Sequence, residues 1–121
     1  MTRYFGFAIA DSMFPSSEDV LVYRTRLSTE EAKYWVGEYK IQSCLNPSHA
    51  ATIAAMKTRF GIDVEIPATP PKVELKVGDG LVVMGVRGLP RLTDRHEYSA
   101  EEISAATFEF HLYMVGASTN Q

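Results

Sequence analysis

Cysteine is almost absent from this sequence: Cys44 is the single one, so the chain cannot form an internal disulfide. A chain of this kind is typical of a reducing compartment, because disulfides accumulate in proteins of oxidising compartments. A structural zinc site is disfavoured as well, since no second thiol stands at metal-ligand spacing. The cysteine content therefore predicts a cytoplasmic protein without structural zinc.

Long hydrophobic runs are also missing. Residues 1–10 carry one basic residue and a short alternating apolar pattern. This pattern matches neither a signal peptide nor the ~18 consecutive apolar residues that a membrane-spanning helix needs. The sequence thus predicts neither export nor insertion into a membrane.

An excess of positive charge is absent. The formal net charge is −3 and the sequence pI is about 5.6, whereas proteins that are attracted to the nucleic-acid backbone usually have a basic balance. A long nucleic acid is therefore not an expected partner. Any nucleotide ligand should be small and recognised by local contacts.

What the chain does contain is typical of one folded domain. Hydrophobic residues make up 45% of its 121 residues and charged residues 22%, which are ordinary values for a globular protein. A chain of this length buries roughly two-thirds of its unfolded surface, so a second domain is not expected. We expect residues 1–115 to form the domain and residues 116–121 to be a frayed tail, because the apolar pattern ends at Val115.

Apolar alternation, turn residues and capping patterns predict the order of strands and helices. The expected strands are Arg3–Ala10, Val20–Leu27, Ile62–Ile66, Val73–Val77, Leu81–Arg87 and Thr107–Val115. Capping boxes at Ser28–Glu31 and Ser99–Glu102 start two helices, and Asn46-Pro47-Ser48 starts another that ends at Gly61. A turn is expected at residues 14–17. One face of the last strand should point to the core through Phe108, Phe110, Leu112 and Met114.

Strands interleaved with short helices indicate the α+β class, as a single domain with a mixed β-sheet covered by short helices. Gly78-Asp79-Gly80 lies between the expected strands Val73–Val77 and Leu81–Arg87 and predicts a hairpin loop. No helix follows it, as one would follow a glycine-rich phosphate loop. The sequence therefore does not predict a doubly wound nucleotide-binding fold.

His49 stands at the amino end of the second expected helix. Amides at such an end attract phosphate, and an imidazole beside them could donate a proton to a leaving oxygen. His49 also begins a stripe of helical spacing with Ile53, Met56 and Phe60, which would place its ring against the core. The sequence leaves both roles open.

Arg24 and Arg26 lie two residues apart on one expected strand and therefore share a face. Two guanidinium groups on one face can fork onto phosphate oxygens. The alternative is a solvated face on which the two arginines pair with Glu18 or Glu65.

The densest group of chemically capable side chains lies in the 88–98 loop: Arg91, Asp94, Arg95, His96, Glu97 and Tyr98. Such density is typical of a binding loop. Its arginines could clamp phosphate, while His96 or Tyr98 could stack on or hydrogen-bond to a base or ribose. The alternative is a loop of internal ion pairs, with Arg91 bound to Asp94 or Arg95 to Glu97.

Two short stretches resemble a family of small viral proteins, a group of unknown function typified by a Sulfolobus turreted-virus protein. The run from Asn46 to Ile53, with His49 and Thr52 inside it, is similar to the His-x-x-Thr-Ile helix start of that family. Arg91-Leu92, followed by Glu101-Glu102-Ile103, is similar to a second motif. The resemblance extends over residues 3–115.

The resemblance implies one of two activities: viral ring nucleases that cut cyclic tetra-adenylate as anti-CRISPR proteins, or anti-Thoeris sponges that sequester glycocyclic ADP-ribose signals as oligomers. By position, His49 would be the nuclease histidine and Asp94 its acidic partner. The sequence has Ala50 where the nucleases have an aspartate, and the shorter Asp94 where they have a glutamate. The stretch 93–98 looks more like the sponge branch.

We therefore expect a phage anti-defence protein that sequesters a cyclic nucleotide immune signal in the host cytoplasm without cleaving it. Its expected ligand-binding residues are Arg91, Arg95, His96, Tyr98, His49, Arg24 and Arg26. No metal or other cofactor is expected, because the three histidines, His49, His96 and His111, lie on separate elements. A metal-independent ring nuclease using His49 and Asp94 is the alternative, and a plain protein-interaction module is the third reading.

The expected partner besides the signal is a second copy of the chain. A chain of 13.5 kDa rarely encloses a dinucleotide-sized ligand alone, and such sites favour subunit boundaries. We expect a symmetric homo-oligomer, at least a dimer. Symmetry could then bring Arg24 and Arg26 of different copies together at a second anion site.

Overall fold

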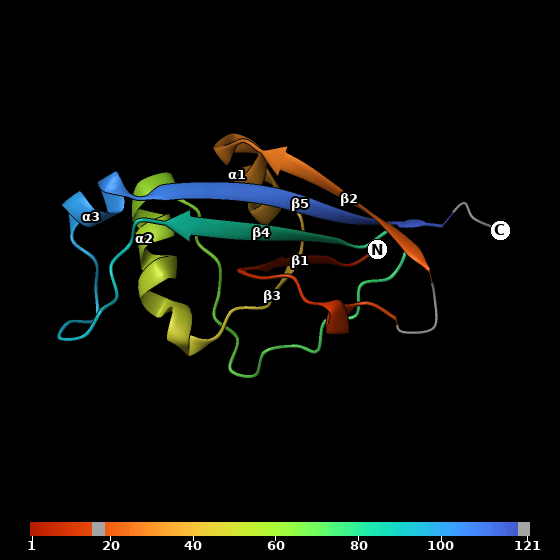
Figure 1. Ribbon diagram of the computed structural model, residues 1–121, viewed down its shortest axis with the longest axis horizontal. Coiled ribbons are helices and arrows are strands. Elements are labelled where there is room, and N and C mark those ends of the chain that lie inside the picture. Colours follow the sequence, from red (N-terminus) through yellow and green to blue (C-terminus); the bar gives the residue numbers. More distant parts are fainter. Residues whose placement is uncertain (16–18, 119–121) are drawn as a thin grey trace.

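The computed structural model describes residues 1–15 and 19–118. Figure 1 shows the course of the chain and labels its main elements. They are β1 (Arg3–Gly6), β2 (Val20–Leu27), α1 (Thr29–Glu38), β3 (Ile41–Ser43), α2 (Ala50–Phe60), β4 (Gly80–Arg87), α3 (Ala100–Ala105) and β5 (Thr107–Ala117). Short 3-10 turns at Asp11–Met13 and Pro47–His49 complete them. The expected turn at residues 14–17 falls partly outside the described residues.

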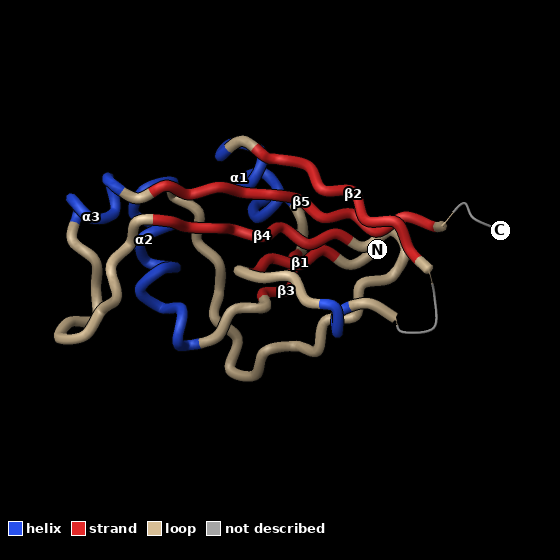
Figure 2. Tube along the Cα trace, viewed as in Figure 1, coloured by secondary structure: helices blue, strands red, loops and turns tan. Residues whose placement is uncertain are grey.

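The five strands form one mixed sheet in the order β2-β5-β4-β1-β3, which Figure 2 shows as a layer of adjacent strands. β1 pairs in parallel with β3 and β4, whereas β5 pairs antiparallel with β2 and β4. The sheet and its short helices confirm the predicted α+β class. In this order β2 is an edge strand, so one side of its backbone has no neighbour in the sheet.

Helices α1 and α2 cover one face of the sheet. Their buried side chains Ala32, Trp35, Ile53 and Met56 pack with residues of β1, β4 and β5, among them Phe5, Val82, Met84 and Phe110. Phe108, Leu112 and Met114 are partly buried against the same cluster. The prediction that these alternate residues of the last strand face the core is confirmed.

The other face of the sheet is covered by irregular segments rather than helices. Val73 and Leu75 pack there with Tyr4, Leu81 and Val115. Met13 and Phe14 contact the same cluster from the amino-terminal part of the chain. This second cover reaches over only part of the face, and the polar side chains of β2 and β5 described below lie on the remainder.

The predicted hairpin around Gly78-Asp79-Gly80 is wrong. Residues 73–77 form no strand, and β4 pairs with β1 and β5 instead. Asp79 holds the turn, because its buried carboxylate accepts hydrogen bonds from the backbone amides of Thr2 (2.8 Å) and Lys76 (3.0 Å). The alternating pattern of residues 73–77 reflects a segment that buries Val73 and Leu75 against the sheet without joining its ladder.

Four further features differ from the expectations. The first strand ends at Gly6 rather than Ala10, and residues 62–66 form no strand although Ile62 and Val64 are buried. The short strand β3 was not predicted, because three residues carry too little periodic signal. β5 continues to Ala117, which pairs with Val20, so the expected frayed tail at 116–121 begins too early; residues 119–121 lie outside the described part.

The helix starts are as predicted. Ser28 and Ser99 each accept a hydrogen bond from the backbone amide three residues later, and Glu31 and Glu102 complete the two capping boxes. Gly61 ends α2 with a positive φ of 70°, a conformation that glycine adopts without strain. Within residues 1–15 and 19–118, none of the helices has the length and apolarity needed to cross a membrane.

Candidate functional site

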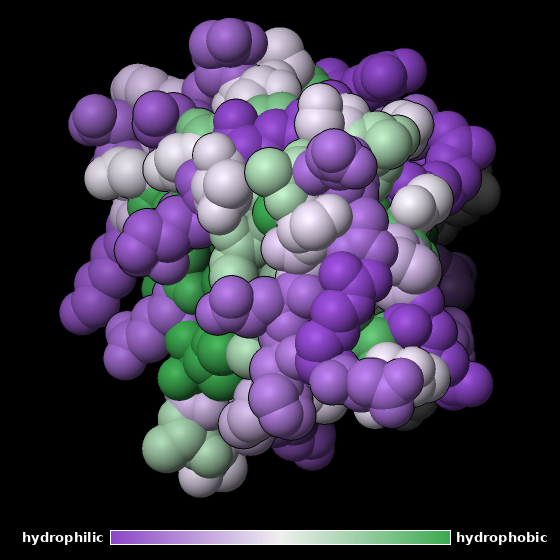
Figure 3. All heavy atoms as spheres, turned by 90° about the vertical axis from the view of Figure 1, so that its left-hand side faces the viewer, coloured by the Kyte–Doolittle hydropathy of each residue, from purple (hydrophilic) through white to green (hydrophobic). Residues whose placement is uncertain are grey.

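The 88–98 loop connects the end of β4 to the capping residue of α3. It extends from one end of the sheet in Figure 1, and Figure 3 views that end of the molecule, whose surface is mostly hydrophilic with scattered hydrophobic patches. Arg91, Arg95 and His96 are exposed, and Tyr98 is half-buried. The structure thus places four expected ligand-binding residues on one solvent-facing loop.

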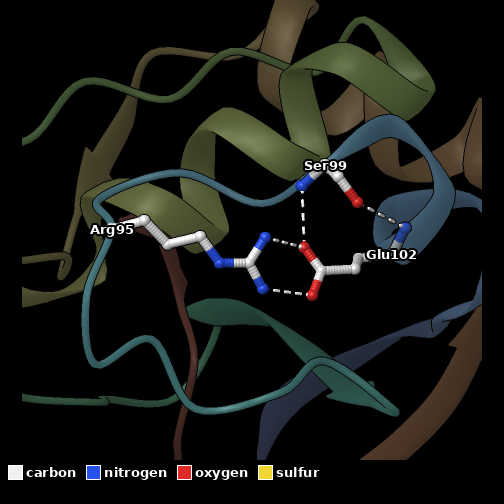
Figure 4. Close-up of polar contacts among 3 residues, drawn as sticks. All are labelled: Arg95, Ser99 and Glu102. Atoms are coloured by element: carbon white, nitrogen blue, oxygen red, sulfur yellow. Dashed lines mark hydrogen bonds and ion pairs between the residues drawn. The ribbon is translucent and has the colours of Figure 1, made fainter.

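Arg95 is held at the base of the loop by Glu102, the third residue of α3. Both terminal nitrogens of its guanidinium donate to the two oxygens of the Glu102 carboxylate. The same carboxylate accepts a hydrogen bond from the backbone amide of Ser99 (2.8 Å), whose hydroxyl accepts one from the Glu102 amide (3.2 Å). Figure 4 shows this three-residue cluster. The loop is therefore tied to the first turn of α3.

This pairing differs from the alternative considered from sequence, in which Arg95 would pair with Glu97. The carboxylate of Glu102 already faces the loop because it completes the capping box, so it offers two fixed oxygens that match a guanidinium fork. Hydrogen bonds from Arg95 are the main cause that lowers the pKa of Glu102 to about 2. The same bonds raise the pKa of Arg95. Both groups are therefore charged at neutral pH.

A hollow of about 620 Å³ opens beside this cluster. It is lined by Arg95, His96, Glu97, Tyr98 and Ser99. Its size falls within the range of roughly 300–1,000 Å³ that is common for small-molecule sites. Arginine, imidazole and phenol groups on its wall supply anion contacts, aromatic surface and hydrogen bonds.

Arg91 lies earlier in the same loop and outside the lining of this hollow. Across the described residues it makes no ion pair with a carboxylate, so the considered pair with Asp94 does not form. Asp94 is exposed and likewise has no such partner in this part of the chain. Within the described residues, the charge of Arg91 is therefore not neutralised by an ion pair inside the loop.

His49 lies at the junction between the 3-10 turn and α2. Its ring meets the ring of Phe7 edge-on, with centroids 4.9 Å apart and planes at 60°, and Phe7 packs against the main core cluster. The Nδ1 atom of His49 is buried without a hydrogen-bond partner in the described chain. The ring therefore lies against the edge of the core, as one of its two sequence-based readings expected.

The amides at this helix start are partly used by Asn46. Its side-chain oxygen accepts hydrogen bonds from the Ser48 amide (2.9 Å) and the Ser48 hydroxyl, and its backbone oxygen accepts one from the His49 amide (3.0 Å). A phosphate bound here would have to displace these contacts. The helix start is consequently a weaker anion site than the sequence suggested.

His49 and α3 mark opposite ends of α2. Arg59, near the carboxyl end, donates hydrogen bonds to the backbone oxygens of Ile103 (3.0 Å) and Ala106, and so holds α3 against that end. His49 stands at the amino end, roughly 16 Å away along an eleven-residue helix. The structure does not join His49 to the Arg95–Glu102 cluster by any contact between described residues.

Arg24 and Arg26 share one face of β2, as predicted, and the strand register places this face opposite the helices. Arg24 donates a hydrogen bond from Nε to the Tyr113 hydroxyl (2.8 Å), and Arg26 lies 3.9 Å from Glu109. Neither pairs with Glu65 in the described part of the chain, and Glu18 lies outside it. The partners come from β5 because the β2–β5 register places Arg24 opposite Tyr113.

The same face carries two further polar groups. Glu109 also pairs with Arg87 (3.2 Å), the last residue of β4, so the arginine cluster adjoins the start of the 88–98 loop. His111 lies opposite Arg26 in the strand register. Burial lowers the pKa of His111, and the positive charge of Arg24 lowers it further. His111 is thus neutral at physiological pH.

A larger hollow, of about 940 Å³, is lined by none of the expected ligand-binding residues. It lies between the segments Asp11–Pro15 and Lys72–Val77, where Lys72 and Glu74 pair with each other (3.7 Å). Its charged side chains are of both signs. The smaller hollow at the 88–98 loop is the better candidate because it is lined by Arg95, His96 and Tyr98, and because Arg95 is held in place by Glu102.

Metal-ligating side chains do not gather anywhere in the described residues, where no group of three or more His, Cys, Asp or Glu could hold an ion. His49, His96 and His111 lie on a turn, a loop and a strand. Burial raises the pKa of the Cys44 thiol to about 11, so this cysteine is a protonated, unreactive group.

Comparisons with known proteins identify a shared fold. No family model matches the chain, and no curated protein matches it significantly. Among solved structures, the chain is similar to B116 of Sulfolobus turreted icosahedral virus (STIV), with a TM-score of 0.68 and 15% sequence identity, over 94% of this chain and 99% of that chain. The likeness shows that the two chains share a fold.

Proposed function

We propose that this chain is a viral anti-defence protein that binds a small cyclic nucleotide immune signal and sequesters it without cleaving it. The observation that carries the proposal is the hollow at the 88–98 loop, which Arg95, His96 and Tyr98 line together. The fold shared with a viral protein supports the viral setting, which would place the protein in the cytoplasm of the host cell.

The chemistry of the loop suits a phosphate-linked, base-containing ring. Arg95 is anchored by Glu102 through its two terminal nitrogens, so its position is set before a ligand arrives and less freedom is lost on binding. Arg91, earlier in the same loop but outside the lining of the hollow, would supply a second guanidinium. His96 and Tyr98 provide ring faces and hydrogen-bonding atoms for a base or ribose. Cyclic ADP-ribose isomers and cyclic oligonucleotides both carry these groups.

The packing of His49, and its lack of a contact with Asp94, support sequestration rather than cleavage. Its ring packs against Phe7, and no hydrogen bond or ion pair between described residues links it to Asp94. General acid–base catalysis needs both groups within about 2.6–3.2 Å of the reacting atoms. His49 lies at a helix start and Asp94 on an exposed loop, and this arrangement does not provide such a pair. No catalytic residue, metal or cofactor is part of the proposal.

The second candidate is a metal-independent ring nuclease for cyclic tetra-adenylate. The observation that favours it is the buried Nδ1 atom of His49, which has no partner in the described residues and could be a proton-transfer group awaiting its substrate. In that case His49 would act as general acid and Asp94 as its acidic partner.

A homo-oligomer is part of the proposal. The hollow at the 88–98 loop is open to solvent, and one small chain does not enclose a ligand there by itself. Edge strand β2 is the candidate contact. Its apolar side chains Leu21, Val22 and Tyr23 are exposed, and an exposed, apolar edge is a template for pairing with another strand. Antiparallel pairing of two β2 strands would bring Arg24 and Arg26 of both copies onto one continuous face.

The test is a capture experiment on the purified protein. It is incubated with cyclic tetra-adenylate and, separately, with cyclic ADP-ribose isomers, then washed, denatured by heat and analysed by chromatography. We expect one class to be retained and released unaltered. The double variant Arg91→Ala/Arg95→Ala is the matched control and should retain none. Retention of no nucleotide by the wild-type protein would contradict the proposal, whereas linear products would favour the nuclease.

A further inference from the structure

A second hollow lies along α1 and shares no residue with the 88–98 loop. It has a volume of about 360 Å³ and is lined by Leu27, Glu30, Glu31, Tyr34, Trp35 and Tyr39. We call it the Tyr34 pocket. Three of its six residues are aromatic and two are acidic. None of the six belongs to the proposed nucleotide site.

The aromatic rings of the Tyr34 pocket are packed edge to face. The ring of Tyr39 meets Tyr34 with centroids 5.8 Å apart and planes at 88°, and it meets Trp35 at 5.5 Å and 68°. Rings that stand nearly perpendicular to one another present both faces and edges to the hollow. Tyr34 is 58% exposed, so its ring is open to a ligand from solvent.

This aromatic group already contacts one guanidinium of the chain itself. The Cζ atom of Arg3, on β1, lies 3.4 Å from the Tyr39 ring centroid and 5.3 Å from that of Trp35. Ring faces are electron-rich and attract cations. A second cation at these rings would be repelled by Arg3 unless negative charge stood nearby, and the two glutamates that line the pocket supply it.

Glu30 and Glu31 are both in the first turn of α1. Neither carboxylate forms an ion pair with a lysine, arginine or histidine in the described part of the chain. Glu31 accepts a hydrogen bond from the Ser28 amide (2.9 Å), and bonds from Ser28 lower the pKa of Glu31. The capping box explains Glu31 but gives Glu30 no partner, so among the described residues the pocket has one carboxylate without an ion pair or a capping role.

We propose that the Tyr34 pocket binds an arginine side chain of a partner protein. The planar guanidinium stacks on aromatic rings and forks onto carboxylates at the same time, and the pocket offers both types of group side by side. Its charge is complementary to that side chain, and its volume admits one such group with its apolar stem against Leu27.

A second copy of this chain is a poorer occupant than a foreign basic segment. On β2 the residues that face the helix side are Leu21, Tyr23, Thr25 and Leu27, whereas Arg24 and Arg26 point to the opposite face. A copy that pairs through β2 would therefore bring no arginine from that strand to the pocket. The proposal is independent of the nucleotide site, which uses different residues.

Trp35 makes the proposal measurable, since it is the single tryptophan of the chain and lines the pocket. The probe is an acetylated, amidated Gly-Arg-Gly tripeptide, titrated while the tryptophan fluorescence of the full-length protein is recorded. The matched peptide carries citrulline, which has the same shape as arginine without its charge. We expect a saturable fluorescence change with the arginine peptide only, and a weaker response at high salt because the carboxylates are exposed.

Variants then test the residues. Glu30→Gln and Tyr34→Ala should each weaken peptide binding by roughly threefold or more, whereas Tyr34→Phe keeps the ring and should bind like wild type. Glu38→Gln, on the same helix but outside the pocket, is the control and should bind unchanged. Equal responses to both peptides, or no saturable change with either, would overturn the proposal. So would fluorescence that follows protein concentration instead of peptide, because that result would identify a second copy as the occupant.

Discussion

The guanidinium of Arg95 forks onto the carboxylate of Glu102, seven residues further along the chain. This pair closes the end of the 88–98 loop on the first turn of α3, where Ser99 and Glu102 already cap each other. A loop that would otherwise be held only at its two ends gains a fixed point beside its most polar residues. The arrangement of the candidate site follows from this one pair.

We predict that Glu102→Gln loosens the loop, because the neutral amide offers the guanidinium one acceptor instead of a charged pair of oxygens. Amide hydrogens of residues 91–98 should exchange faster than in wild type, in an experiment without ligand. Glu101→Gln, one residue earlier and without an ion pair to any described residue, serves as the control and should exchange at the wild-type rate. Equal exchange in both variants would contradict a role for Glu102 in ordering the loop.

The pair also predicts a pH dependence. The pKa of Glu102 is lowered from 4.5 to about 2 in the folded chain, so the contribution of its carboxylate to stability is fully present above pH 4.5 and is lost as the pH falls toward 2. Because the pair lies at the surface, with the Glu102 side chain still 22% exposed, we expect a change in local order more than in global unfolding. The carboxyl carbon shift of Glu102, followed by NMR from pH 6 to 2, should stay almost constant down to about pH 4 and change only as the pH approaches 2; a complete titration with a midpoint near 4.5 would contradict the prediction.

The helix boundaries could be predicted from sequence because each depends on residues close in the chain. Ser28 and Ser99 stand three residues before a glutamate, and the capping boxes form as that spacing requires. The segment 73–77 has an equally regular pattern and is not a strand. Its apolar residues would be buried against the sheet whether or not the segment paired as a strand. The alternating pattern therefore indicates burial of one face and not strand pairing.

The residues of the candidate site could be predicted from the sequence, but the contacts between them could not. The density of charged and aromatic residues at positions 91–98 identified the loop. Arg95 pairs with Glu102 and not with Glu97 because of the path of the loop and the direction in which α3 begins. The spacing of residues along the sequence predicts neither of these two features. The partners of Arg24 and Arg26 depend likewise on the β2–β5 register, which brings together residues about ninety positions apart, such as Arg24 and Tyr113.

Affinity for the nucleotide signal should depend on Arg91 and Arg95. Each charge-assisted contact to a phosphate contributes about 1.5–3 kcal/mol, so Arg91→Ala and Arg95→Ala should each weaken binding about tenfold or more, as measured by isothermal titration calorimetry. Lys57→Ala removes an exposed cation of α2 that pairs with Asp63 (3.3 Å) and should leave the affinity unchanged. Wild-type affinity in both arginine variants, with the fold intact, would remove these residues from the site.

Oligomer formation should depend on the exposed edge strand β2. Tyr23 is 57% exposed there, and replacing it by a charged residue protects an edge from pairing. We expect the wild-type chain to scatter light as at least a dimer at micromolar concentration and Tyr23→Lys to shift toward the monomer. Val77→Lys, a substitution of equal chemistry at an exposed residue away from β2, should not shift it. A monomeric wild-type protein would contradict the expectation.

His49 separates the two candidate functions. Its ring packs against Phe7 with centroids 4.9 Å apart, and edge-to-face aromatic pairs contribute about 0.5–1.5 kcal/mol beyond the area that they bury. His49→Ala should therefore lower the free energy of unfolding by about 1–2 kcal/mol, measured by urea denaturation. His49→Phe keeps an aromatic ring and should retain most of that stability.

The same two variants decide between sequestration and cleavage. A sponge does not use the imidazole for chemistry, so the nucleotide released from wild type, His49→Phe and His49→Ala should be intact in all three, with affinities alike at a temperature where each is folded. A ring nuclease would behave differently: wild type would release linear products, and both variants would lose them together, because phenylalanine restores the packing but cannot transfer a proton. Linear products that disappear in folded His49→Phe would overturn the sequestration proposal and assign His49 as the general acid.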